Sequence, residues 1–167
     1  DLGTRLQTTC VGLKPMHITR PTTDFGVDIP FVKLLGFVLT VCADGQSEIH
    51  YEPQPEHLNS YSVTHGGAVM TLLDVTMAMA ARSGPGHAGV VTVEMKTSFM
   101  RPSHGALTCQ GRLMHRTATL AFTEASVLDE QGKVCAHATG TFKYIRRLPT
   151  TASSVHDFNN PNAQADA

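Results

Sequence analysis

The chain has 167 residues, a formal net charge of −1 and no basic run longer than Arg146-Arg147. Its length suits one domain with a substantial core, and its near-zero charge argues against binding nucleic acid through a basic surface. The four cysteines form no CxxC pair and the nine histidines form no HxH or HxxxH pair, which argues against a disulfide framework and a metal site.

An irregular N-terminal extension is predicted over residues 1–26, where polar and apolar residues follow no clean period. The motif Asp28-Ile29-Pro30 then predicts the start of a short helix, because proline is favoured in the first helical turn. We expect this helix to end at Gly36. Its buried side is expected to consist of Phe31, Leu34 and Leu35.

Two strands, 37–43 and 47–52, flank Asp44-Gly45, a dipeptide typical of tight hairpin turns. The second strand alternates, with Ile49 and Tyr51 on one face and charged residues on the other. No stretch has the length and flanks of a signal peptide. We therefore expect a soluble, cytoplasmic protein whose cysteines are reduced.

The stretch 66–81 predicts a buried helix in which Asp74 is the only ionisable side chain. A helix that is apolar all round is a buried one, and a carboxylate is rarely buried without a partner or a chemical role. Desolvation would raise the pKa of Asp74 toward the range useful for proton transfer. The alternative is an aspartate that caps a loop or pairs with a distant arginine. One apolar stripe is expected to contain Val69, Leu72, Leu73, Thr76 and Ala80, and the opposite side Met70, Met77, Ala78 and Ala81.

The helix is entered through His65-Gly66-Gly67, with Asn59 six residues before the histidine. Glycines at a helix N-terminus leave backbone N–H groups unpaired and unshielded, and such groups can stabilise an oxyanion. Taken alone, the two glycines favour a tight turn and close packing over an anion site. With Asp74 eight residues beyond Gly66, one helix carries both an anion-stabilising end and a carboxylate base.

Four strand-like segments follow a break at 83–86, and a polar tail predicted to be disordered begins at residue 148. Strand alternation places Thr92 with Glu94 and Lys96, away from the face that the helix covers. Small residues in the middle of the last strand would let the helix lie across the sheet there. The four predicted segments are 90–100, 107–114, 119–128 and 134–145.

This order of elements predicts an α+β fold over residues 27–147, in which a curved antiparallel sheet of about six strands wraps one long helix. A short helix precedes the first strand of this sheet. Because one curved sheet can cover only one side of the helix, the remaining apolar surface predicts a second subunit in an isologous dimer.

The chain resembles the hotdog-fold acyl-CoA thioesterases of the PaaI (phenylacetate-pathway) type, in the 4-hydroxybenzoyl-CoA thioesterase superfamily. The resemblance rests on the joint spacing of Asn59, His65-Gly66-Gly67 and Asp74, followed by Thr92-Val93-Glu94-Met95 and Phe99-Met100-Arg101-Pro102. The resemblance covers about residues 28–146. It implies an acyl-CoA substrate, no cofactor and no metal, with no nucleic-acid or membrane partner. It also implies a homodimer whose active sites lie between subunits. A dimer of dimers is expected, although the sequence leaves both the dimer and the tetramer open.

The resemblance implies a role for each matching residue. Asp74 would activate water or attack the thioester carbon, and the Gly66 N–H would polarise the thioester carbonyl. Asn59 would help to fix the site and His65 would orient the loop. Thr92 would orient the water, but strand alternation allows this only if its face looks into a crevice shared with the partner.

Candidates for the CoA phosphates are basic residues near strand ends or at exposed strand positions: Lys96, Arg101, Arg112 and Arg116. Of these, Arg101 and Arg116 are selected, and Gly67 is the further substrate-binding candidate. An aromatic or medium-chain acyl group is expected, in a tunnel that could be lined by Met70, Met77, Phe99 and Tyr61.

Two other functions stay open. A hotdog dehydratase or hydratase of acyl thioesters would use His65 with Asp74, whereas a non-catalytic acyl-CoA-binding module would have no need for Asp74. The chain contains no GxSxG motif, so a serine nucleophile of the α/β-hydrolase kind is not indicated.

Overall fold

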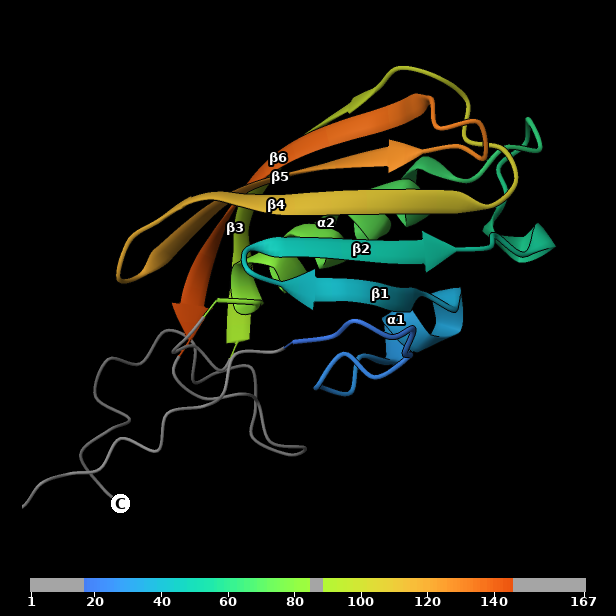
Figure 1. Ribbon diagram of the computed structural model, residues 1–167. Coiled ribbons are helices and arrows are strands. Elements are labelled where there is room, and N and C mark those ends of the chain that lie inside the picture. Colours follow the sequence, from blue (N-terminus) through green and yellow to red (C-terminus); the bar gives the residue numbers. More distant parts are fainter. Residues whose placement is uncertain (1–16, 85–88, 146–167) are drawn as a thin grey trace, which may run out of the picture.

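A long helix lies against one face of a six-stranded antiparallel sheet in the computed structural model, which describes residues 17–84 and 89–145 (Figure 1). The strand order is β1-β2-β4-β5-β6-β3. The predicted α+β hotdog architecture is confirmed, whereas the predicted tail lies outside the described residues. The elements are α1 (Pro30–Leu35), β1 (Val38–Ala43), β2 (Gln46–Tyr51), the 3₁₀ turn η1 (Pro55–His57), α2 (Gly66–Arg82), β3 (Gly89–Phe99), β4 (Leu107–Arg116), β5 (Leu120–Leu128) and β6 (Val134–Ile145).

The β1–β2 hairpin turns at Asp44 and Gly45, as predicted. Both residues have positive φ, 50° and 79°, the conformation that matches the right-handed twist of the flanking strands. Ile49 and Tyr51 are buried beneath α2, so the predicted alternation of β2 is also confirmed.

Helix α1 starts and ends where the sequence predicts, but of its predicted buried residues only Leu35 is buried. Val32 and Leu35 are buried, whereas Phe31 and Leu34 are 53% and 72% exposed. Phe31–Leu34 and Val32–Leu35 have the same three-residue spacing, so the pattern alone does not decide which pair faces inward. Packing in the core decides it, because Val32 and Leu35 join the buried cluster.

The two edges of the sheet differ. At the β1 edge, Ile18 and Thr22 form backbone hydrogen bonds with Cys42 and Leu39, so part of the N-terminal extension covers that edge. At the other edge β3 pairs only with β6 within the described part of the chain. An uncovered strand edge offers unpaired N–H and C=O groups to a second chain.

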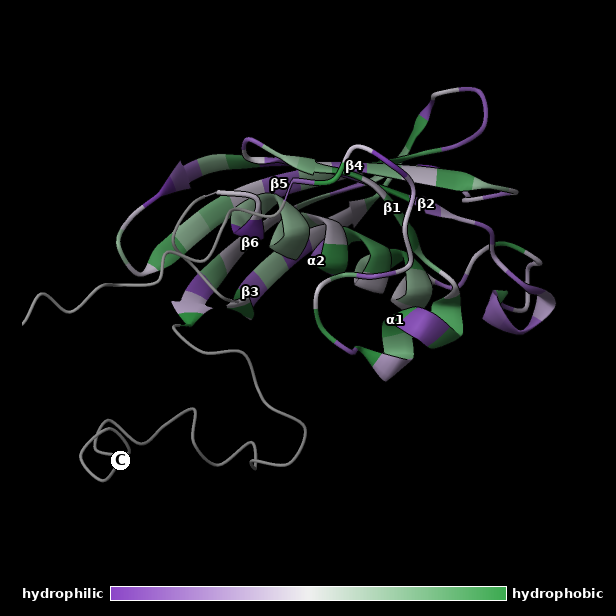
Figure 2. Ribbon diagram, turned by 60° about the horizontal axis from the view of Figure 1, so that its bottom comes forward, coloured by the Kyte–Doolittle hydropathy of each residue, from purple (hydrophilic) through white to green (hydrophobic). Residues whose placement is uncertain are grey.

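Helix α2 approaches the sheet where the strands carry glycine. Met77 lies over Gly140, so closely that a Cβ on this glycine would be 3.1 Å from the Met77 Cε. Met77 and Ala81 are therefore buried against the sheet, which corrects their predicted place on the opposite side of the helix. Figure 2 shows the mostly apolar ribbon of α2 crossing the sheet. Six residues of α2 form its uncovered face, none of them buried: Gly66, Gly67, Met70, Thr71, Asp74 and Ala78.

Gly111 in β4 is the position where an added methyl group would do most damage. A Cβ there would lie 2.9 Å from Thr76 Cγ2 and 3.1 Å from the Thr76 backbone oxygen. We expect Gly111→Ala to lower the free energy of unfolding by about 1–3 kcal/mol, because the helix backbone must move away. Urea unfolding measures this loss. Gly140→Ala is the matched control with a smaller expected loss, because only side chains, those of Met77 and Phe142, lie 3.1 Å from the added Cβ and no helix backbone must move. Equal losses would contradict this account.

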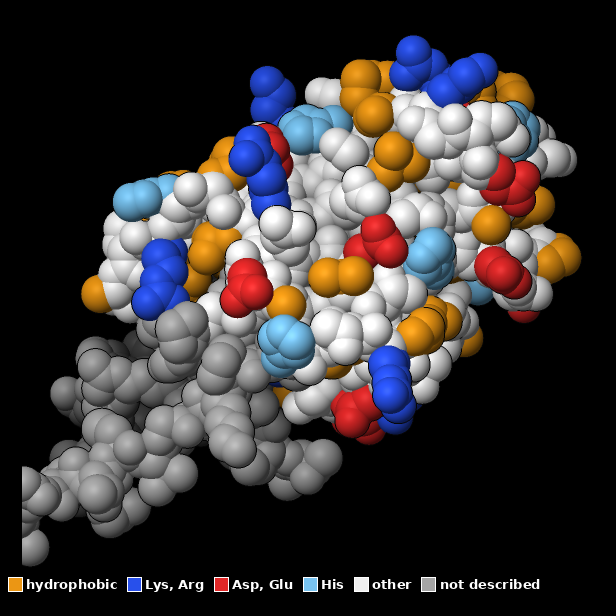
Figure 3. Space-filling model, viewed as in Figure 1, with side chains coloured by type: hydrophobic (Ala, Val, Ile, Leu, Met, Phe, Trp, Pro, Cys, Tyr) orange, Lys and Arg blue, Asp and Glu red, His pale blue; other side chains and the backbone are white. Residues whose placement is uncertain are grey.

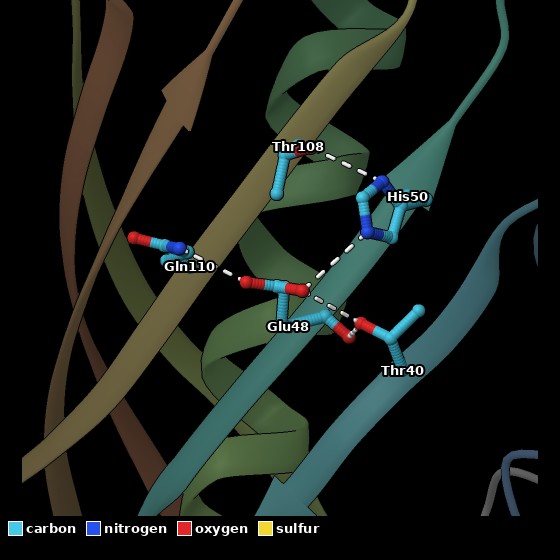
Figure 4. A network of polar contacts seen from close by, with 5 residues as sticks. All are labelled: Thr40, Glu48, His50, Thr108 and Gln110. Atoms are coloured by element: carbon cyan, nitrogen blue, oxygen red, sulfur yellow. Dashed lines mark hydrogen bonds and ion pairs between the residues drawn. The ribbon is translucent and has the colours of Figure 1, made fainter. Parts of the chain in front are cut away.

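The outer face of the sheet is covered by polar side chains that bond to one another. Glu48 accepts hydrogen bonds from Thr40 Oγ1 and Gln110 Nε2, both at 2.9 Å (Figure 4). His50 Nε2 lies 3.4 Å from Glu48 Oε1, and its Nδ1 lies 3.1 Å from Thr108 Oγ1. Figure 3 shows charged and histidine side chains spread over this side, with only separate apolar patches.

In the described residues no helix has the length and apolarity needed to cross a bilayer.

Candidate active site

Asp74 lies near the middle of α2, on the uncovered face of the helix. Its Oδ1 accepts a hydrogen bond of 2.7 Å from Thr92 Oγ1. In the described part of the chain, Asp74 forms no ion pair. Burial raises the pKa of Asp74, and the Thr92 hydrogen bond opposes part of that increase. A half-buried carboxylate with a raised pKa and no counter-ion is suited to accept a proton.

Thr92 faces α2 because of a bulge at Val93, which corrects the strand alternation predicted from the sequence. Thr92 pairs with Phe142, but the next pair is Glu94 with Thr141, so Val93 is an extra residue. Since Phe142 is buried against the helix, its partner Thr92 also points to that side. A one-residue bulge reverses the alternation of every residue before it. Thr92 therefore reaches Asp74 of its own chain without any partner subunit.

Replacing Thr92 with valine is expected to shift the pH dependence of activity. The hydroxyl lowers the pKa of Asp74, so its removal raises that pKa further. If the carboxylate is the active form, the acid limb of the profile of kcat/KM against pH moves to higher pH. Thr92→Ser keeps the hydroxyl and is expected to retain the wild-type profile. A valine variant whose acid limb does not move would contradict this role.

His65 is the N-cap residue of α2, and its side chain occupies one of the two glycine amides. His65 Nδ1 accepts a hydrogen bond of 2.9 Å from the Gly67 N–H. The ring lies so close that a Cβ on Gly67 would be 3.1 Å from Nδ1, so a side chain there would displace it. The His65 N–H donates in turn to the His57 carbonyl at 2.9 Å, a contact that no sequence pattern indicates.

Gly66 keeps its N–H available. As the first residue of the helix it has no acceptor within α2, and no atom of the described residues accepts a hydrogen bond from it. The ring of Phe99 lies beside it, 3.5 Å from the place of a Cβ on Gly66. Of the two glycine amides, therefore, Gly66 is the one that can donate to an oxyanion.

Asn59 shapes the loop that leads into the helix. Its Oδ1 accepts hydrogen bonds from the backbone N–H groups of Tyr61 at 2.9 Å and Val63 at 3.3 Å. Ser62 has a positive φ of 57°, so the chain turns sharply here. The loop holds Tyr61 outward with 83% of its surface exposed. Asn59 thus acts on the backbone of the loop, and Asp74 is not among its hydrogen-bond partners.

Gly66 and Asp74 are too far apart to act on one thioester within a single chain. Eight residues of α-helix span about 12 Å along the axis. An oxyanion donor must lie about 3 Å from the oxygen, while the base must reach a water beside the same carbonyl group. The two groups can meet at one substrate only if they come from different protomers.

The two candidate arginines lie near opposite ends of α2. Arg101 follows β3 and donates from Nη1 to the Val134 carbonyl at 2.7 Å. The loop beyond it reaches the helix entrance, where the Thr64 N–H donates to Ser103 O at 3.0 Å. Arg116 ends β4 beside Gly84, at the C-terminal end of the helix. Since α2 has 17 residues and spans about 25 Å, one chain does not bring these arginines together.

Comparisons with known proteins find similarity to thioesterases and esterases. A sequence profile described as thioesterase superfamily matches residues 61–136. A predicted esterase of Saccharolobus solfataricus is 28% identical over 103 residues, covering 61% of this chain and 74% of that protein. The structure of a phenylacetic acid degradation-related protein from Ralstonia eutropha, described as a predicted thioesterase, has 28% identity and a TM-score of 0.63, covering 70% of this chain and 92% of that one. The Escherichia coli PaaI protein shares the fold at 22% identity and a TM-score of 0.66, covering 71% and 86%.

Proposed function

We propose that this chain, a PaaI-like hotdog thioester hydrolase of the thioesterase superfamily, hydrolyses acyl-CoA to a free acid and CoA. The observation that carries the proposal is the Asp74 carboxylate, which is half-buried on the uncovered face of α2 and held by Thr92 without a counter-ion. A module that only binds acyl-CoA would have no use for such a group.

In the proposed reaction Asp74 acts as general base. Water adds to the thioester carbon while its proton passes to the carboxylate, and the carbonyl oxygen becomes an oxyanion. The Gly66 N–H of the partner subunit donates to that oxyanion. Collapse of the intermediate breaks the C–S bond and CoA leaves as its thiolate. A general base contributes roughly 10²–10⁴-fold and a backbone donor on the order of 3 kcal/mol, so we propose that the reaction needs no metal and no cofactor.

The separation of Gly66 and Asp74 supports a homodimer with shared active sites. The open β3 edge supports it, as do exposed apolar side chains on and next to this strand. Val93 is 57% exposed, Phe99 53% and Met100 52%. Apolar side chains at an uncovered strand edge are typical of a surface that a second subunit covers.

The acyl group is proposed to be aromatic or of medium length. Met70 and Phe99 are both exposed and lie on the two elements that carry Asp74 and Thr92, while Tyr61 projects from the loop before α2. Met77 does not belong to this set, because its side chain is fully buried between α2 and Gly140 of the sheet. Of the two arginines, Arg101 lies nearer the helix entrance and is the better candidate for a CoA phosphate.

A panel of acyl-CoA thioesters tests the function directly. Release of free thiol with aromatic or medium-chain substrates is the expected result. A change in C=C absorbance without thiol would instead identify a hydratase or dehydratase. Saturable binding with neither signal would identify a binding module.

The relative effects of two substitutions separate hydrolysis from hydration. His65→Ala is expected to reduce kcat less than Asp74→Asn does, because His65 bonds to the Gly67 backbone and Asp74 takes the proton. His65→Asn is expected to recover part of the loss, since asparagine also caps helices. Steady-state kinetics of the three variants measure the order; a larger loss for His65→Ala would favour the dehydratase reaction.

A further inference from the structure

The backbone on either side of the Gly66 N–H is held by two hydrogen bonds. On one side the His65 N–H donates to the His57 carbonyl at 2.9 Å, and on the other the Gly67 N–H donates to His65 Nδ1 at 2.9 Å. Because each residue has only two soft backbone dihedral angles, fixing both neighbours of an amide also fixes the direction of its N–H. The second bond lies within the helix entrance itself, whereas the first depends on a residue outside it.

His57 is itself held at two points of the short η1 turn. Its N–H donates to the Gln54 carbonyl at 2.8 Å, and its ring Nδ1 accepts a hydrogen bond of 3.1 Å from the Gln54 N–H. The ring also packs near Tyr51, with ring centroids 5.8 Å apart. Tyr51 is buried at the end of β2 and contacts Phe37 edge-on at 4.9 Å, so it belongs to the rigid core. The His57 carbonyl therefore has a fixed place relative to the sheet.

We propose that His57 is a positioning residue of the active site, whose carbonyl aligns the Gly66 N–H with the oxyanion through His65. The proposal rests on the function proposed above, because it concerns the oxyanion donor of that reaction. The His57 ring takes no part in the chemistry and serves to keep the carbonyl in place. Since the oxyanion forms only after water begins to attack, misalignment of its donor lowers kcat and leaves KM unchanged.

His57→Phe tests the proposal, because phenylalanine keeps a ring near Tyr51 but cannot accept the Gln54 hydrogen bond. We expect kcat for thiol release to fall by about 10-fold at unchanged KM. His57→Asn is expected to restore most of this loss, since its Oδ1 can accept from the Gln54 N–H in place of Nδ1. His50→Phe is the matched control on the outer face of the sheet, where His50 Nδ1 lies 3.1 Å from Thr108 Oγ1, and it is expected to keep the wild-type kcat. Equal losses at the two histidines would overturn the proposal.

A double-mutant cycle shows whether the effect of His57 passes through Gly66. Gly66→Pro removes the N–H that His57 is proposed to align, at a helix position where proline is favoured. In that background His57→Phe is expected to change kcat by less than about 2-fold, because the group to be aligned is absent. A substitution that only loosened the fold would lower kcat by the same factor in both backgrounds, and that result would contradict the positioning role.

Hydrogen exchange at the His65 amide, followed by NMR without substrate, separates this proposal from the reaction. His57→Phe is expected to speed exchange at His65 by about 3–10-fold, the factor that corresponds to one hydrogen bond. Unchanged exchange would refute the positioning role even in a protein that releases thiol from acyl-CoA. Faster exchange in a protein that hydrolyses no acyl-CoA would support the hold of His57 on the helix entrance and refute the proposed reaction.

Discussion

Replacing Asp74 with asparagine is expected to lower kcat for acyl-CoA hydrolysis by at least ~10², with little change in the affinity for substrate. Asparagine has nearly the same shape and can still accept the Thr92 hydrogen bond, but it does not take a proton from water. Thiol release measures kcat, and equilibrium binding of a non-hydrolysable acyl-CoA analogue measures affinity. Near wild-type turnover would exclude Asp74 as the base.

The same variant distinguishes a catalytic Asp74 from a structural one. Because burial raises the pKa of Asp74, folding favours its protonated form. The stability from this protonation is complete below the ordinary aspartate pKa of about 4 and is lost as pH rises through the raised pKa. At neutral pH the wild-type chain carries the cost of a buried charge, which asparagine removes. We therefore expect a melting temperature equal to or above that of the wild type, whereas loss of a structural ion pair would lower it.

The strongly patterned parts of the chain were predictable from the sequence. The Asp44-Gly45 turn, the proline at the start of α1 and the position of Asp74 in a long apolar helix each leave a local signal. A glycine in a strand indicates close approach of another backbone, and Gly111 beneath α2 is such a case. These features depend on the residue and its immediate neighbours.

The features that were missed depend on packing between elements. A helix that is apolar all round contains no information about which side meets the sheet, so the predicted side of Met77 is wrong. The bulge at Val93 lies among β-branched residues without glycine or proline, and pairing with β6 creates it. Once the bulge is known, the Thr92–Asp74 contact follows directly.

Replacing Gly66 with proline is expected to remove the oxyanion donor while the helix is kept. Gly66 is the first residue of α2, where proline is favoured and its missing N–H breaks no helical bond. His65 is extended before it, with ψ at 135°, as a residue preceding proline should be. We expect kcat to fall by about 10²–10³. Gly66→Ala keeps the N–H and its Cβ would meet Phe99 at an ordinary 3.5 Å, so this control is expected to stay active.

Mixing the two inactive proteins tests whether each site is shared. In a dimer of one Asp74→Asn chain and one Gly66→Pro chain, one site combines an intact Asp74 with an intact Gly66 of the partner subunit, and the other site lacks both. After unfolding and refolding together at equal concentrations, half of the dimers are mixed, so about one quarter of wild-type activity is expected to return. If both groups acted within one chain, every site would lack one of them and the mixture would stay inactive. Activity that returns in the mixture, but in neither protein refolded alone, therefore requires two chains at one thioester.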